Sequence, residues 1–225
     1  MVPLNCAEMP VREINRTLRS LPAGSQVSIL EPRGAHNLAV GLETALDITI
    51  DGNAGYYIAG LSAGPNVTVR GSVGWGVAEN LMSGVVRIEG NASESAAASA
   101  HGGHVFIAGD ASLRAGISLK GGTLVVAGDI GNAGAFMAQA GTILVGGGAG
   151  EALGDSLYEA VIYVHGTIRG LGADARVEEL NEADVLLIKD LVERSGFTHI
   201  DPEQVTKVAS AKQLYNFDAL KAQRY

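Results

Sequence analysis

The sequence has few of the residues on which secreted, membrane-bound or nucleic-acid-binding proteins depend. A single cysteine, Cys6, excludes an internal disulfide framework. No apolar run approaches the ~20 residues of a membrane-spanning helix, and the first residues lack the pattern of a signal peptide, so we expect a cytoplasmic protein. Only 16 Lys and Arg oppose 24 Asp and Glu, and the net charge of −8 argues against binding to nucleic acid or an anionic membrane.

Aromatic and charged residues are also scarce, at 5% and 18% of the 225 residues. Glycine is abundant, with 31 copies. Little charge and much glycine are typical of low-complexity chains, but an apolar content of 47% predicts a chain that folds. The glycines therefore require a structural explanation.

One glycine recurs every nineteen residues. Apolar, mostly β-branched residues lie four and two positions before it, as Ile48 and Ile50 do in the first copy, and this alternation predicts a short strand that ends in a turn. Nineteen residues are too few for a helical repeat or a propeller blade. The pattern predicts an all-β fold, a right-handed parallel β-helix of about seven coils with short helical flanks. The seven glycines are Gly52, Gly71, Gly90, Gly109, Gly128, Gly147 and Gly166.

The repeat also predicts the organisation of the chain. Residues 46–175 are expected to form the seven coils, after an N-terminal helix (residues 10–21) and an irregular first coil within residues 1–45. Residues 176–225 are expected to form a helical cap or tail. Apolar spacing predicts a helix from Asn181 to Arg194, capped by Asn181 or Asp184, and Asp201 is interpreted as the start of a further helix.

The position three residues before each repeat glycine should point away from the bore of the β-helix. It is polar in the first three coils, where Thr49, Thr68 and Arg87 occupy it. In the last four coils it is apolar, and we call these residues the apolar strip: Phe106, Val125, Leu144 and Tyr163. A strip of this length is not expected to stay exposed to water. Either the helix at 181–194 or a partner subunit should cover it, and we favour the partner.

A second candidate interface lies in the first two coils. Tyr56, Tyr57 and Trp75 stand four or five residues after the repeat glycines of adjacent coils, and we call them the aromatic patch. Clustered aromatic residues of this kind are more typical of an interface than of a cofactor site.

Residue patterns that could carry chemistry are weak. The glycine-rich segments 71–76 and 146–150 resemble phosphate loops, but neither is followed by Lys-Ser/Thr and both belong to the nineteen-residue register. His101 and His104 are expected to be surface residues, because no third metal ligand has a matching spacing. The carboxylates show no readable pair. We therefore assign no catalytic, cofactor-binding or metal-binding residue in this chain.

At this level of detail the repeat resembles a known family. Segment 147–154 reads Gly-xx-Gly-xxx-Gly, and segments 52–59, 71–78 and 128–135 echo it with a final alanine. This pattern is similar to the GXXGXXXG repeat of the C-terminal β-helix domain of the glutamate synthase large subunit. Among free-standing chains, the sequence most resembles the stand-alone β-helix subunit of N-methylglutamate synthase, also called methylamine–glutamate N-methyltransferase.

The resemblance implies a function in a complex. Such a chain would be a non-catalytic structural subunit that docks a glutamine-amidotransferase-like subunit and an FMN-binding subunit. Cofactors would then belong to the partners: FMN, with or without an iron–sulfur cluster. The complex would convert glutamate and methylamine to N-methylglutamate and ammonia.

Two alternatives remain open at the level of sequence. The chain also resembles the β-helix subunit of formylmethanofuran dehydrogenase and its formyltransferase/hydrolase relative, although those proteins look longer and lack the helical tail. The other alternative is an independent acyltransferase built on a β-helix. That enzyme would need a catalytic histidine and a coenzyme A groove, which the scattered histidines do not supply.

Overall fold

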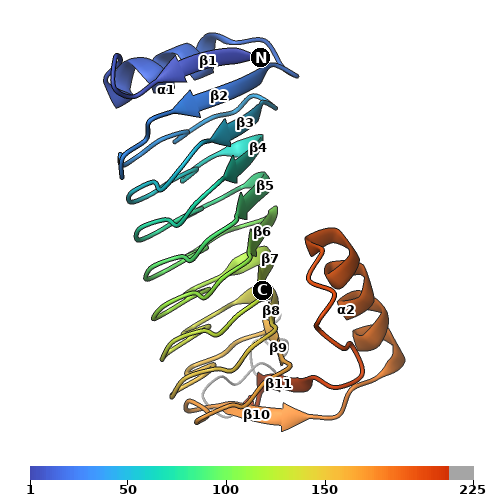
Figure 1. Cartoon of the computed structure of the whole chain (residues 1–225). Coiled ribbons are helices and arrows are strands. Elements are labelled where there is room, and N and C mark those ends of the chain that lie inside the picture. The colour runs from blue at the N-terminus through green and yellow to red at the C-terminus, as the bar shows by residue number, and fades with distance from the viewer. Residues whose placement is uncertain (213–225) are drawn as a thin grey trace, which may run out of the picture.

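The structure is a computed structural model, and it describes residues 1–212. The chain forms a column of stacked coils with a helix at its N-terminal end and a second helix along its C-terminal half (Figure 1). The prediction of an all-β parallel β-helix with about seven coils is confirmed.

Seven strands, one from each coil, form the parallel centre of the sheet. They pair with a step of nineteen residues, so that Ile48 pairs with Val67 and Ile143 pairs with Ile162. The register shifts only at the first residues of β4 and β7, where Ala63 pairs with Ser83 and Lys120 with Ala140. The strands are β3 (Asp47–Ile50), β4 (Ala63–Val69), β5 (Ser83–Ile88), β6 (His104–Ile107), β7 (Lys120–Val126), β8 (Ala140–Val145) and β9 (Val161–Val164). The repeat read in the sequence is therefore the hydrogen-bond register of the sheet.

The bore of the β-helix is apolar, as the sequence predicts. Ile88 and Val126, two positions before their repeat glycines, are fully buried. The column two positions after the glycines also lies inside and forms a second, minor ladder of parallel bridges from Val73 to Ile168. Burial of this continuous apolar column is the main source of stability, at about 25 cal/mol per Å² of apolar surface.

The repeat glycines are required by close approach between coils. A Cβ atom on Gly71 would lie 2.6 Å from Oδ1 of Asn53 in the preceding coil and 2.8 Å from its backbone nitrogen. Gly84 and Gly141, near the starts of β5 and β8, meet a second requirement as well: they have φ near +101°, a conformation that side chains rarely adopt. The two glycine-rich segments that resemble phosphate loops are parts of these coils.

The N-terminal segment closes one end of the bore. Strands β1 (Val2–Asn5) and β2 (Gln26–Leu30) extend the parallel sheet beyond β3. Helix α1 (Val11–Ser20) confirms the predicted helix and buries Ile14 and Leu18 completely. The Asn15 side chain donates to the carbonyl of Asn37 and accepts from the backbone N–H of Ala39, which ties the helix to the first coil.

The C-terminal end is closed by strands rather than by a helical cap alone. Strand β10 (Ala175–Glu178) and strand β11 (Thr206–Ser210) pair in antiparallel fashion, and β11 also pairs with β9. Helix α2 (Glu182–Ser195) lies between them in the chain. The expected helix start at Asp201 is wrong: a turn there, with the Gln204 N–H bonded to the Asp201 carbonyl, leads into β11, which covers the open edge of β9. Residues 213–225 of the expected tail lie outside the described residues.

The fold generates one prediction about the bore. Val126→Asp should lower the free energy of unfolding by about 3 kcal/mol or more, because it places an unpaired carboxylate among apolar side chains. Urea unfolding followed by circular dichroism measures the change. Leu113→Asp, at an exposed apolar position, is the matched control and should change stability little. Equal stability of the two variants would contradict the assignment of Val126 to the core.

Candidate functional site

The apolar strip is covered by the chain itself. Phe106, Val125, Leu144 and Tyr163 form a second hydrophobic cluster with residues of α2 and of the segment that follows it, among them Ile188, Leu191 and Ile200. Figure 1 shows α2 standing beside the C-terminal half of the column. The expectation that a partner subunit covers the strip is therefore wrong: these four residues are core and do not form an external interface.

The coil surface beside the strip accommodates the segment that follows α2. A Cβ atom on Gly146 would lie 2.8 Å from Nε2 of His199 and 3.0 Å from Cδ1 of Ile200. The His199 ring also reaches the carbonyl of Ala127 at 3.0 Å. Glycine at position 146 therefore lets the segment after α2 approach the coil closely.

The N-terminal end of α2 is fixed by a buried charged group. Asp184 forms a capping box with Asn181, so both sequence candidates take part in the cap. The Tyr163 hydroxyl donates to one Asp184 oxygen at 2.6 Å, and the Lys207 ammonium donates to the other at 2.9 Å. Burial raises the pKa of Asp184, but these hydrogen bonds outweigh burial and hold the pKa below its ordinary value.

Arg87 fixes the C-terminal end of α2. Its guanidinium donates to the carbonyls of Ser195 and Arg194 at 2.8 and 3.0 Å, where the helix leaves carbonyls without helical partners. The same group lies 4.7 Å from the centre of the Phe106 ring. Sequence reasoning missed this contact, although Arg87 is the last polar residue before the column turns apolar.

His104 is not a free surface residue as predicted. Its ring stacks on Phe106 at 6.0 Å, and its Nδ1 is buried without a hydrogen-bond partner in the described chain. Burial lowers its pKa, nearby Arg194 lowers it further, and Asp190 opposes the effect. Burial and Arg194 therefore favour the neutral form of the ring over the imidazolium.

The aromatic patch, in contrast, is exposed. Tyr56, Tyr57 and Trp75 retain 40, 44 and 49% of their accessible surface. The Tyr56 ring stacks between His36 at 4.3 Å and Trp75 at 5.3 Å, so three successive coils contribute one row of parallel rings. The structure brings the predicted residues together, and their function as an interface remains a prediction.

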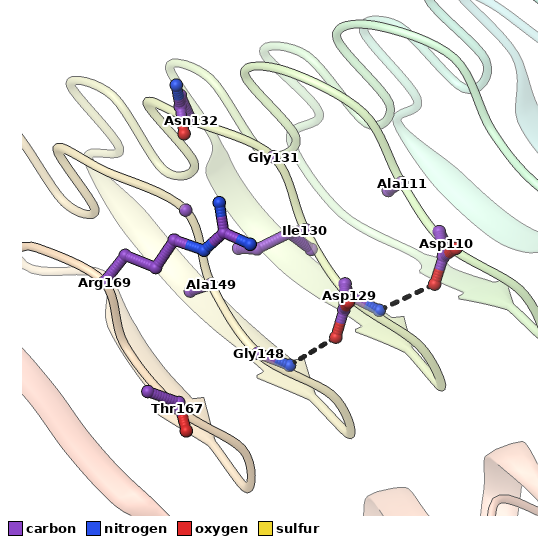
Figure 2. A pocket seen from close by; sticks show the side chains of 11 residues that line it. Asp110, Ala111, Asp129, Ile130, Gly131, Asn132, Gly148, Ala149, Thr167 and Arg169 are labelled. Atoms are coloured by element: carbon purple, nitrogen blue, oxygen red, sulfur yellow. Dashed lines mark hydrogen bonds between the residues drawn. The ribbon is translucent and has the colours of Figure 1, made fainter.

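A polar groove runs along another edge of the last coils, with a volume of about 490 Å³ (Figure 2). Asp110 accepts from the backbone N–H of Asp129 at 2.8 Å, and Asp129 accepts from that of Gly148 at 2.6 Å. Figure 2 shows the Arg169 side chain extending toward Ile130 across the groove. Asn53, Ser72 and Asn91 begin the same ladder, so these polar residues, each one position after a repeat glycine, join each coil to the next.

The groove is lined mainly by acidic, apolar and small side chains. Its polar lining consists of carboxylates, an amide, a hydroxyl and the Arg169 guanidinium, without a histidine or lysine to activate a nucleophile. Among residues 1–212, no group of three or more His, Cys, Asp and Glu side chains is placed to hold a metal ion. The Cys6 thiol is partly buried, and burial raises its pKa, which disfavours the reactive thiolate. Within this same part of the chain, no helix is long and apolar enough to cross a membrane.

Comparison with known proteins places the chain in a family. No protein-family model matches it. It is 46% identical over 228 residues to Protein GlxC of Rhizobium meliloti (strain 1021), and the match covers all of both chains. The chain belongs to the GlxC family. This relationship fits the glutamate-synthase-related family that the repeat resembles.

The covering of the strip generates a second prediction. Leu144→Glu should destabilise the isolated chain by about 3–5 kcal/mol, because Leu144 is fully buried beneath α2. In the Leu144→Glu variant, the backbone amide hydrogens of α2 should exchange faster than those of β3–β5. Leu186→Glu is the matched control, since this leucine on the outer face of the same helix is 67% exposed. Wild-type stability of Leu144→Glu would contradict the docking of α2.

His104 generates a prediction about pH. The pKa of the folded protein's His104 lies below its ordinary value of 6.5, so the unfolded chain binds the proton first as the pH falls. The free energy of unfolding should therefore decrease between about pH 7.5 and about pH 5.5. His104→Gln should show a smaller decrease in urea unfolding, and an equal decrease would contradict the assignment. Asp184 does not interfere, because its lowered pKa preserves its contribution until the pH falls below about 4.

Proposed function

We propose that this chain is a non-catalytic structural subunit of a heteromeric glutamate-synthase-like complex, with N-methylglutamate synthase as the specific enzyme. In this proposal it docks a glutamine-amidotransferase-like subunit and an FMN-binding subunit and holds their sites at a fixed distance. FMN, with or without an iron–sulfur cluster, would belong to the partners. The repeat resemblance and the full-length relationship to GlxC support membership of such a complex.

The observation that carries a docking function is the contrast between the two apolar surfaces. The apolar strip is already covered by α2, whereas the row of stacked rings in the first coils is left open to water. Large aromatic side chains that are exposed and fixed in place are typical of interface anchors. The rigid column also suits a spacer, because each coil is hydrogen-bonded to its neighbours along its length.

Affinity purification of the tagged chain from its own cells tests the proposal. We expect an amidotransferase-like chain and a flavin-containing chain to co-purify in a constant ratio, and the complex to form N-methylglutamate from glutamate and methylamine. Deletion of the gene for this chain should abolish that activity in cell extracts, and re-expression of the wild-type chain should restore it. The same purification from untagged cells is the control.

The same experiment separates the alternatives. A metal-dependent, hydrolase-like partner would replace the proposal by a formyl-transfer complex. Activity of the chain alone, or FMN bound to the purified single chain, would contradict a non-catalytic subunit whose cofactors lie in the partners.

A further inference from the structure

A small pocket lies between the aromatic patch and two glutamates. Its volume is about 210 Å³, and Tyr57, Trp75, Glu79 and Glu94 contribute its larger side chains. Gly76 makes room for it, because a Cβ atom there would lie 2.7 Å from the Tyr57 ring and 2.9 Å from a Glu79 oxygen. Glycine at this position therefore lets the Tyr57 ring and the Glu79 carboxylate lie close to the backbone at the pocket.

The aromatic wall of the pocket is held in place before any ligand arrives. Trp75 stacks on Tyr56, which stacks on His36, so the indole cannot rotate freely. The backbone N–H of Tyr57 bonds to the carbonyl of Trp75 at 2.7 Å and fixes the two aromatic residues relative to each other. A preorganised wall of this kind reduces the entropy lost on binding.

The rim of the pocket carries uncompensated negative charge. Glu94 forms an ion pair with Arg114 at 3.2 Å. Glu79 has no ion pair or side-chain hydrogen bond within residues 1–212. The whole chain has a net charge of −8, so a positively charged group is favoured at this site over a negative one.

We propose that this pocket receives an arginine side chain from a partner subunit, with the guanidinium stacked on Trp75 and paired with Glu79. The inference rests on the proposed function, because it needs a partner. A planar guanidinium can stack on an aromatic face and donate to a carboxylate at the same time, which the compact ammonium of lysine does less well. The chain uses a related combination internally, where Arg87 lies over the Phe106 ring and donates to backbone carbonyls at the end of α2.

Trp75 is the sole tryptophan of the chain, so it can report on the pocket directly. The chain is labelled with fluorotryptophan and titrated with the unlabelled partner subunits from the purified complex. We expect the single fluorine resonance of the wild-type chain to shift on binding. Dissociation constants of the wild-type chain and of all variants are measured by calorimetric titration, which needs no tryptophan. The dissociation constant should rise at least about tenfold for Glu79→Gln and for Trp75→Leu, whereas Trp75→Phe should keep most of the affinity.

The matched control for charge is Glu89→Gln, since Glu89 is exposed and lies outside the pocket. Its affinity should stay within about twofold of wild type, and Glu79→Gln should show the weaker dependence of affinity on salt. Equal affinity of the two variants, or binding without a fluorine shift, would overturn the inference while leaving the proposed function intact. A resonance that shifts with free arginine while the Glu79→Gln complex is unimpaired would also overturn it. If no partner binds the wild-type chain, the proposed function fails and the inference fails with it.

Discussion

The structure depends on the backbone hydrogen bonds between one coil and the next. In a parallel β-helix the backbone N–H and C=O groups of a strand can bond only to the coils on either side. Each coil must therefore match its neighbours in length and register. The step of nineteen residues from β3 to β9, interrupted only at the first residues of β4 and β7, keeps this match. The same constraint selects glycine where coils meet closely, because a Cβ atom at Gly71 would collide with the coil before it. This need to match neighbouring coils accounts for the abundant glycine, the fixed length of the repeat and the columnar shape of the molecule.

Stacking leaves an open bore and unpaired strand edges at both ends of the column, and the repeat itself cannot cover them. At the N-terminal end, α1 places Ile14 and Leu18 over the bore, and Asn15 satisfies backbone groups of the first coil. At the C-terminal end, β11 pairs with β9 in the antiparallel direction and covers its edge. Strand β10 pairs with the other side of β11 and forms the last strand of the sheet.

Stacking also lines up side chains in rows on the outside of the column. One of these rows is covered by the chain itself, and another stays exposed. The apolar strip receives α2, which is held at one end by Asp184 and at the other by Arg87. The row from His36 to Trp75 has no such cover. A chain with few aromatic residues thus concentrates several of them at one exposed edge, and that concentration is the reason to look there for a partner.

The sequence by itself determined the repeat and the bore, because period-two alternation and glycine spacing recur in every coil. It also determined both helices, through the spacing of their apolar residues. It also marked the aromatic patch, whose members lie in neighbouring coils. Only the tertiary structure decided what covers the apolar strip, since contacts between Arg87 and Ser195 join residues far apart in the chain and no spacing rule predicts them. The turn at Asp201 was decided in the same way: the open edge of β9 required a strand, and this demand outweighed a local helix signal.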